Sequence, residues 1–219
     1  MQLTDIETPA LIIDADIMER NLRIMKEWCG KTGMGLRPHF KTPKTPAIAW
    51  KQIELGARGV CCQKLGEAEV LVMAGIKDIL ITNEIVEPTK IDRMVLLNRH
   101  SSVMVCVDNK DNVGALAHYA RSRDVKLGVM VDIDVGQNRT GVRPGPAALE
   151  LCREITKHES LELKGLQAYC GHLQMAEHTI VREGKTKGLE RVCQLFSMTT
   201  NCIEDAGIRV ETRSGAGTG

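Results

Sequence analysis

Five apolar residues in a row stand near the middle of the sequence, Leu127-Gly128-Val129-Met130-Val131, and Asp132 follows them directly. A strand that is covered on both faces shows such an unbroken run, whereas a strand with one wet face alternates apolar and polar residues. Parallel strands are covered in this way because the helices that connect them pack on the sheet. The run therefore predicts a central strand of a parallel sheet over residues 127–134.

Segments of the same kind recur on both sides of this run and alternate with stretches of helical spacing. We expect strands at 36–41, 59–63, 79–83, 103–108, 127–134, 163–172 and 209–214, and helices near 17–32, 45–56, 65–74, 88–99, 110–123, 146–158 and 185–206. These seven β–α steps favour an α/β fold, a (β/α)8 barrel of the TIM type that lacks its last unit. An open doubly wound sheet is the alternative.

The composition excludes several classes of protein. Of the 219 residues, 43% are hydrophobic and 26% are charged, and the net charge of +1 gives no bias toward nucleic acid or anionic membranes. No apolar run approaches the ~20 residues of a membrane helix, and the N-terminus lacks the pattern of a signal peptide. Eight cysteines without a C-x-x-C spacing indicate buried free thiols in a reducing compartment. We expect a cytoplasmic protein with neither nucleic-acid nor membrane partners.

Three basic residues mark the end of the first expected strand. Side chains alternate along a strand, so Arg37, His39 and Lys41 share one face. A face of this kind meets solvent, an anion or a carbonyl compound, because such residues are rarely buried without partners. Lysine forms Schiff bases where a neutral amine is available. Taken alone, a solvated surface lysine is the simpler interpretation of Lys41, so the case for chemistry depends on the rest of the chain.

Two loops at other strand ends support that case. The chain ends in Ser214-Gly215-Ala216-Gly217-Thr218-Gly219, whose bare amides suit a phosphate group, although a flexible tail has the same composition. The stretch from Asp132 to Val142 carries one arginine, Arg139, which suits a phenolate or carboxylate, or an ion pair with an aspartate that orders the loop. A lysine, a phosphate loop and an arginine at three strand ends together predict pyridoxal phosphate as cofactor.

The sequence resembles the fold-type III pyridoxal-phosphate enzymes, in particular the group of D-threonine aldolase, D-3-hydroxyaspartate aldolase and D-serine dehydratase. The matching stretches follow the order of that family: Thr8-Pro9-Ala10-Leu11 with Asp14, Arg37-Pro38-His39-Phe40-Lys41-Thr42, Cys61-Cys62-Gln63-Lys64, Thr82–Pro88, Asp132–Val142, Gly165–Tyr169 and Ser214–Gly219. The resemblance implies a barrel of the alanine racemase N-terminal kind.

The resemblance also assigns roles to individual residues. It implies that Lys41 carries the cofactor covalently, that Gln63, Thr82, Arg139 and Tyr169 line it, and that Ser214, Gly215, Gly217 and Thr218 hold its phosphate. Without the resemblance, Gln63 is an ordinary polar strand end and Tyr169 a packed aromatic residue. The aldolases often have a histidine where this chain has Met175, so we take His172 as the candidate for proton transfer. A lone histidine at a strand end is more often structural.

The family implies more than this chain supplies. Its members continue into an eighth strand and a β-rich second domain, which carries a divalent metal such as Mn, Mg or Zn. Residues 1–219 are then the pyridoxal-phosphate-binding barrel domain, with no metal ligand of their own, and residues 8–14 form a strand that pairs with the absent C-terminal domain. We expect a missing C-terminal segment or another chain to complete the unit, and the complete protein to be a homodimer.

The residues and the resemblance leave four functional hypotheses. The leading hypothesis is retro-aldol cleavage of a small D-3-hydroxy amino acid, similar to D-threonine, to glycine and an aldehyde. The alternative is a dehydratase acting on D-serine or a D-3-hydroxy amino acid, which gives a 2-oxo acid and ammonia. A racemase is disfavoured because Lys41 lacks the Lys-Ala-Asn-Ala-Tyr-Gly type of run found there. A protein that binds pyridoxal phosphate without turnover is the hypothesis from a different class.

Overall fold

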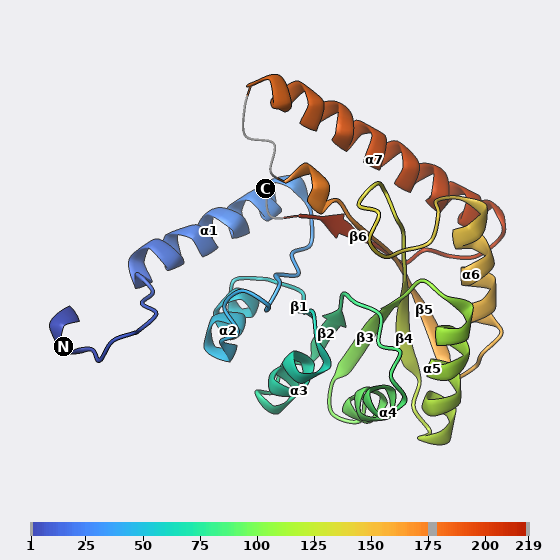
Figure 1. Cartoon of the computed structure of the whole chain (residues 1–219), viewed down its shortest axis with the longest axis horizontal. Coiled ribbons are helices and arrows are strands. Elements are labelled where there is room, and N and C mark those ends of the chain that lie inside the picture. Colours follow the sequence, from blue (N-terminus) through green and yellow to red (C-terminus); the bar gives the residue numbers. More distant parts are fainter. Residues whose placement is uncertain (1, 175–178, 218–219) are drawn as a thin grey trace.

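One sheet of six parallel strands forms the centre of the molecule, in a computed structural model that describes residues 2–174 and 179–217. The strands are β1 (Val60–Cys62), β2 (Asp78–Ile81), β3 (Ser102–Val107), β4 (Leu127–Asp132), β5 (Leu161–Tyr169) and β6 (Thr212–Ala216). Their order in the sheet is their order in the chain (Figure 1). A doubly wound sheet reverses its strand order partway, so the barrel-like prediction is confirmed and the alternative is wrong.

Seven α-helices lie between or beside these strands in the described residues. They are α1 (Ala15–Thr32), α2 (Pro46–Glu54), α3 (Leu65–Met73), α4 (Pro88–Leu97), α5 (Lys110–Ser122), α6 (Pro146–Thr156) and α7 (Thr179–Asp205). Helix α1 begins two residues before the predicted start at 17 because the Asp14 carboxylate accepts a hydrogen bond from the Ile17 amide at 2.9 Å and caps the helix. None of the helices in this part of the chain is long and apolar enough to cross a membrane.

The alternation of side chains along the strands creates two separate cores. Residues such as Ile81 on β2 and Val105 on β3 join a large cluster with the helices that cover the sheet. The alternate positions form a small second cluster on the other face, made of Cys61, Leu80, Met104, Cys106 and Met130. The curved sheet is thus covered by helices on the outside and closed by a few side chains on the inside, as in a barrel.

The first predicted strand, 36–41, is wrong as a strand, so the sheet has six strands in the described residues and not the predicted seven. His39 forms only an isolated parallel bridge with Cys61, supported by a hydrogen bond from the Phe40 amide to the Cys61 carbonyl at 2.7 Å. Pro38 lacks an amide hydrogen to extend the ladder, and the chain turns immediately, since the Lys44 amide donates to the Phe40 carbonyl at 2.9 Å. The segment is therefore a short edge contact followed by a turn.

Other parts of the chain also differ from expectation. Strand β5 ends at Tyr169, and His172 lies beyond it in a short 3-10 helix, Gly171–Leu173. The last strand runs from 212 to 216 rather than from 209 to 214, so Gly215 belongs to the sheet and not to a loop. Glycine suits that place because a Cβ there would lie 2.5 Å from the Ala168 carbonyl oxygen. Residues 8–14 form no strand; their pairing with a further domain stays a prediction.

The cysteines form no disulfide, as expected, and five of the eight are buried. Cys193 is exposed, so the prediction of buried thiols holds for most but not all of them. Burial raises the pKa of the Cys61 thiol to about 12. The inner thiols are therefore packing residues rather than nucleophiles.

Candidate cofactor site

The carboxyl edge of the sheet brings together side chains from distant parts of the sequence. Tyr169 stands at the end of β5, with the Lys41 amine 5.8 Å and the Arg139 guanidinium carbon 5.0 Å from the centre of its ring. Two cations so close to one aromatic ring interact favourably with its π-electrons. The structure thus places Lys41, Arg139 and Tyr169, which the sequence predicted separately, around one point. Active sites of barrels lie at this edge.

Arg37 does not share this site, although strand alternation placed it on the same face. Its guanidinium makes a two-point ion pair with Asp78, at the amino-terminal end of β2, with Nη2 3.1 Å from Oδ2. Asp78 and Lys41 therefore mark opposite ends of the sheet. The reason is the turn that follows Phe40: the predicted strand is too short for its alternate residues to line one surface.

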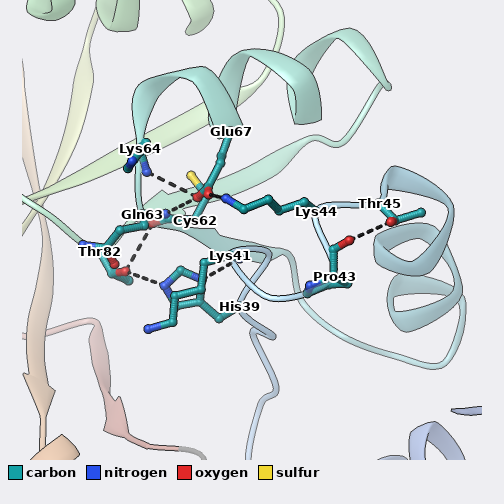
Figure 2. A network of polar contacts seen from close by, with 10 residues as sticks. All are labelled: His39, Lys41, Pro43, Lys44, Thr45, Cys62, Gln63, Lys64, Glu67 and Thr82. Carbon is teal, nitrogen blue, oxygen red and sulfur yellow. Dashed lines mark hydrogen bonds and ion pairs between the residues drawn. The ribbon is translucent and has the colours of Figure 1, made fainter. Parts of the chain in front are cut away.

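His39 has a defined tautomer, and it links Lys41 to β1 and β2 (Figure 2). The Thr82 hydroxyl donates to the Cys62 carbonyl at 3.2 Å, so its oxygen accepts from His39 Nε2 at 3.1 Å. The Lys41 amide in turn donates to His39 Nδ1 at 3.2 Å. Burial, helped by the charge of Lys41, lowers the pKa of His39. The imidazole is therefore neutral at pH 7, with its proton on Nε2.

No role for His39 was predicted beyond its place in a run of basic residues. Both of its ring nitrogens are used by neighbours that come from the lysine turn and from the end of β2, so it holds these two elements together. The predicted residues Gln63 and Thr82 both belong to this group, because Gln63 also lies within hydrogen-bonding reach of His39. A histidine two residues before a lysine is the signal that was present in the sequence.

The loop that carries Arg139 is ordered by three aspartates. Asp132 accepts from the Thr140 hydroxyl at 2.9 Å, and Asp108 accepts from the Gly141 amide at 3.0 Å. Asp134 accepts from the amides of Gly136 and Asn138, both at 3.0 Å. Among the described residues, no carboxylate lies within ion-pair distance of Arg139. The ion-pair interpretation of this loop is therefore wrong: the aspartates order the backbone, and the guanidinium points to Tyr169.

Two carboxyl groups near this loop, those of Glu84 and Asp132, have raised pKa values. Burial raises the pKa of Glu84 to about 7, and the charges of Asp108 and Asp132 add to the effect. Burial likewise raises the pKa of Asp132 to about 6. The sequence matched Glu84 within a family stretch but gave it no role. Its position after β2 became meaningful only once the ends of β2, β3 and β4 were seen to meet.

The predicted phosphate loop lies next to the same tyrosine. In the β5–β6 ladder, Ser214 is the partner of Gln167 and Ala216 is the partner of Tyr169. Ala216 has φ +87°, a value that residues with a side chain rarely adopt, at the point where the chain leaves the sheet. Gly217 faces the side chain of Gln174, which a Cβ at this position would overlap. Thr218 and Gly219 lie outside the described residues.

The structure describes His172 but not Met175. His172 is exposed and lies beside Gly136, where a Cβ would be 3.2 Å from its Nε2 atom. It therefore borders the Arg139 loop, and its part in proton transfer stays a prediction. Met175 lies outside the described residues. No group of three or more His, Cys, Asp or Glu side chains in the described ranges has the arrangement of a metal site.

The residues present fit pyridoxal phosphate. Gln167 is 8% exposed, and its buried Oε1 atom has no hydrogen-bond partner in this part of the protein, which leaves an acceptor for a donor from a bound group. Its ladder partner is Ser214, at the start of the glycine-rich chain end, and Tyr169, two residues further along β5, has an amine and a guanidinium at its ring. These are the functional groups that an aldehyde, a phenolate oxygen and a phosphate require.

Known proteins resemble this chain along its whole length. A D-threonine aldolase from Arthrobacter sp. is 37% identical over 217 residues, which are 99% of this chain and 56% of the relative. A 3-hydroxy-D-aspartate aldolase from Paracoccus denitrificans is 38% identical over 100% of this chain and 56% of its own length. The crystal structure of D-threonine aldolase from Filomicrobium marinum superposes with a TM-score of 0.94 at 38% identity, over 97% of this chain and 57% of that one.

The chain thus spans little more than half the length of the curated relatives it matches. A family model described as the alanine racemase N-terminal domain matches residues 13–219. The match agrees with the sheet order, with the lysine at the carboxyl edge and with the resemblance seen in the sequence alone. The chain therefore belongs to the alanine racemase N-terminal domain family.

Proposed function

We propose that this chain is the cofactor-binding domain of a pyridoxal-phosphate-dependent lyase that cleaves D-3-hydroxy amino acids to glycine and an aldehyde. The observation that carries the proposal is the position of the Lys41 amine and the Arg139 guanidinium against the Tyr169 ring. Relatives that cover the whole chain and are named as aldolases support this activity over others. Relatives of the same fold do not by themselves fix the reaction.

Each residue has a defined task in this proposal. Lys41 supplies the amine that attaches the cofactor, and Arg139 supplies positive charge for the ring oxygen. Gln63 and Thr82 border the site from β1 and β2, while Ser214, Gly215, Gly217 and Thr218 would hold the phosphate. When bound, pyridoxal phosphate supplies an electron sink for the broken carbon–carbon bond.

The protein residues around the lysine must keep it in place and keep the surroundings neutral or positive. Neutral His39 does the first by bridging the Lys41 amide and the Thr82 hydroxyl. Tyr169 does the second by holding two cations at one ring. The proton of the substrate hydroxyl requires an acceptor, for which His172 is our candidate. A divalent metal and its ligands belong to the expected longer unit.

The partners predicted from the resemblance follow from the same proposal. They are a small D-amino acid as substrate, a C-terminal segment or second chain that completes the unit, and a second copy of the complete protein in a homodimer. A cytoplasmic location also remains a prediction.

Borohydride reduction in the presence of pyridoxal phosphate, followed by peptide mapping, tests the attachment point. We expect the reduced label on Lys41, and its loss in Lys41→Ala. Lys64→Ala is the matched control, because this lysine is also exposed and lies next to Gln63. A label on Lys44, on Lys64 or on no lysine contradicts the assignment.

Product analysis with D-threonine then tests the reaction. Glycine and acetaldehyde support the aldolase. A 2-oxo acid and ammonia indicate the dehydratase instead. In the unit completed by its expected C-terminal segment and metal, a labelled Lys41 without any product from D-threonine, D-serine or D-3-hydroxyaspartate indicates a cofactor-binding protein without turnover.

A further inference from the structure

Lys41 lies in an exposed turn that is fixed at both ends by other residues. On one side Phe40 is 3% exposed, and its amide donates to the Cys61 carbonyl at 2.7 Å. On the other side the Lys44 amide donates to the Phe40 carbonyl at 2.9 Å and closes the turn. The amine of Lys41 lies 5.8 Å from the centre of the Tyr169 ring, which is too far for a hydrogen bond to hold it. Its place therefore depends on what holds the turn.

Lys44 adopts an unfavourable backbone conformation in this turn. Its φ of +45° lies in the left-handed region, which residues with a side chain rarely adopt. A residue stays in such a conformation only when its surroundings hold it there. The contact that holds Lys44 is an ion pair between its amine and the carboxylate of Glu67, on the first turn of α3 (Figure 2).

Glu67 is suited to this task because the protein fixes its carboxylate. The residue is 9% exposed, and its second oxygen accepts from the Gln63 amide at 2.7 Å and from the Lys64 amide at 3.4 Å. Burial opposes the charge, yet the hydrogen bonds from Lys44 and from the Gln63 amide lower the pKa of Glu67 below its usual value. The carboxylate is therefore ionised at neutral pH, in contact with the end of β1 and the start of α3.

We propose that Lys44 and Glu67 are positioning residues for Lys41, which they aim at the cofactor site by clamping the turn of residues 40–44 to the end of β1. The proposal rests on the proposed function only in taking Lys41 as the attachment point. It goes beyond a helix cap because the cap uses the amides of Gln63 and Lys64, whereas the clamp uses the Lys44 amine. The two tasks can thus be separated by substitution.

Lys44→Met removes the ion pair, keeps the length of the side chain and leaves the cap of α3 intact. We expect backbone hydrogen exchange in residues 40–45 to become about tenfold faster, because the turn opens more often. The unfolding midpoint in urea should change little, since the lysine side chain is 60% exposed. Lys44→Arg should restore slow exchange by restoring the pair. Lys64→Met is the matched control and should exchange like the parent protein.

The same variants should differ in how fast pyridoxal phosphate attaches. We expect Lys44→Met to slow attachment about tenfold, which corresponds to an increase of about 1.4 kcal/mol in the activation free energy. Lys44→Arg and Lys64→Met should stay close to the parent. Unchanged exchange in Lys44→Met overturns the clamp, whether or not the cofactor binds. Faster exchange with unchanged attachment overturns its role in aiming Lys41. Faster exchange in Lys44→Met, combined with a parent protein whose Lys41 takes no label, keeps the clamp but overturns the proposed function.

Discussion

The N-terminal segment, residues 2–32, and the sheet-centred part that follows it both contain amphipathic helices, but only the second part buries their apolar faces. Helix α1 has apolar residues at helical spacing, as α4 and α6 do, yet none of its residues is buried, while α4 buries Ile91, Met94 and Val95 completely. Leu11 is 98% exposed and Trp28 is 55% exposed. The apolar spacing decides that a segment is amphipathic. Whether the apolar face contributes to stability depends on a surface that covers it.

Figure 1 makes the contrast visible. Helices α3 to α6 lie against the curved sheet, whereas α1 and the residues before it extend away from it. Within the described residues, the segment from 2 to 32 contains no buried residue. Substitutions in the two regions should therefore differ strongly in their effect on the free energy of unfolding.

The largest difference should come from apolar truncation. Ile81 on β2 is 0% exposed, so Ile81→Ala should lower the free energy of unfolding by about 2–5 kcal/mol through lost burial and a cavity. Leu11→Ala, at a residue that is 98% exposed, should change it by less than about 0.5 kcal/mol. Urea unfolding followed by circular dichroism measures both. A large loss in Leu11→Ala would show that the N-terminal segment is covered in solution.

A second effect should appear as a pH dependence that belongs to the sheet-centred part. The pKa of Glu84 is raised from 4.5 to about 7 in the folded protein, so the folded state holds more protons than the unfolded state between these values. The contribution of Glu84 to the free energy of unfolding therefore falls as the pH rises through this range. Glu84→Gln removes the cost, and the variant should exceed the parent by on the order of 2 kcal/mol near pH 8 and match it near pH 4.

Urea unfolding of the parent and of Glu84→Gln across this pH range checks the sign. Asp108, Asp132 and Arg139 surround the carboxyl and are unchanged in the variant. A parent protein that gains stability between pH 5 and pH 7 relative to Glu84→Gln would contradict the raised pKa.

A smaller loss should follow from a buried hydrogen bond. Asn112 on α5 is 6% exposed, and its Nδ2 atom donates to the Ile85 carbonyl at 2.8 Å. Asn112→Ala leaves that carbonyl without its partner and should cost about 1–2 kcal/mol. Asn21→Ala on exposed α1 is the matched control and should be neutral or slightly stabilising, because alanine favours helices. Equal effects at the two positions would remove this part of the contrast.

The sequence predicted the parallel sheet and its helices because both depend on local patterns. Buried strands such as β3 and β4 are unbroken apolar runs, and prolines or capping residues mark the starts of α4, α5 and α6. The segment 36–41 failed because pairing depends on backbone donors as well as on composition, and Pro38 has none. The last strand shifted because Gly215 reads as a loop residue, yet the close approach of Ala168 requires glycine in the sheet.

The site was predicted by chemistry and by resemblance, and the structure supplied what neither contains. Lys41, Arg139 and Tyr169 were all named from the sequence, but their meeting brings together a turn, a loop after β4 and the end of β5, which no local pattern relates. His39 and Glu67 went unnoticed because their roles consist of contacts with residues that they position. Positioning residues have no motif of their own, whereas a reactive lysine in a family stretch does.

The smallest effect should be found at the ion pair that joins the two regions. Lys51 on α2 contacts Glu19 on α1 at 2.8 Å, and both side chains are more than two-fifths exposed, at 46% and 44%. Exposed pairs gain little because water and salt screen them and because two long side chains must be ordered. Lys51→Met should therefore leave the urea midpoint unchanged, at low and at high salt. A clear, salt-dependent loss would mean that α1 is held to the rest of the molecule more firmly than its exposure indicates, and that its lack of buried residues understates its share in the fold.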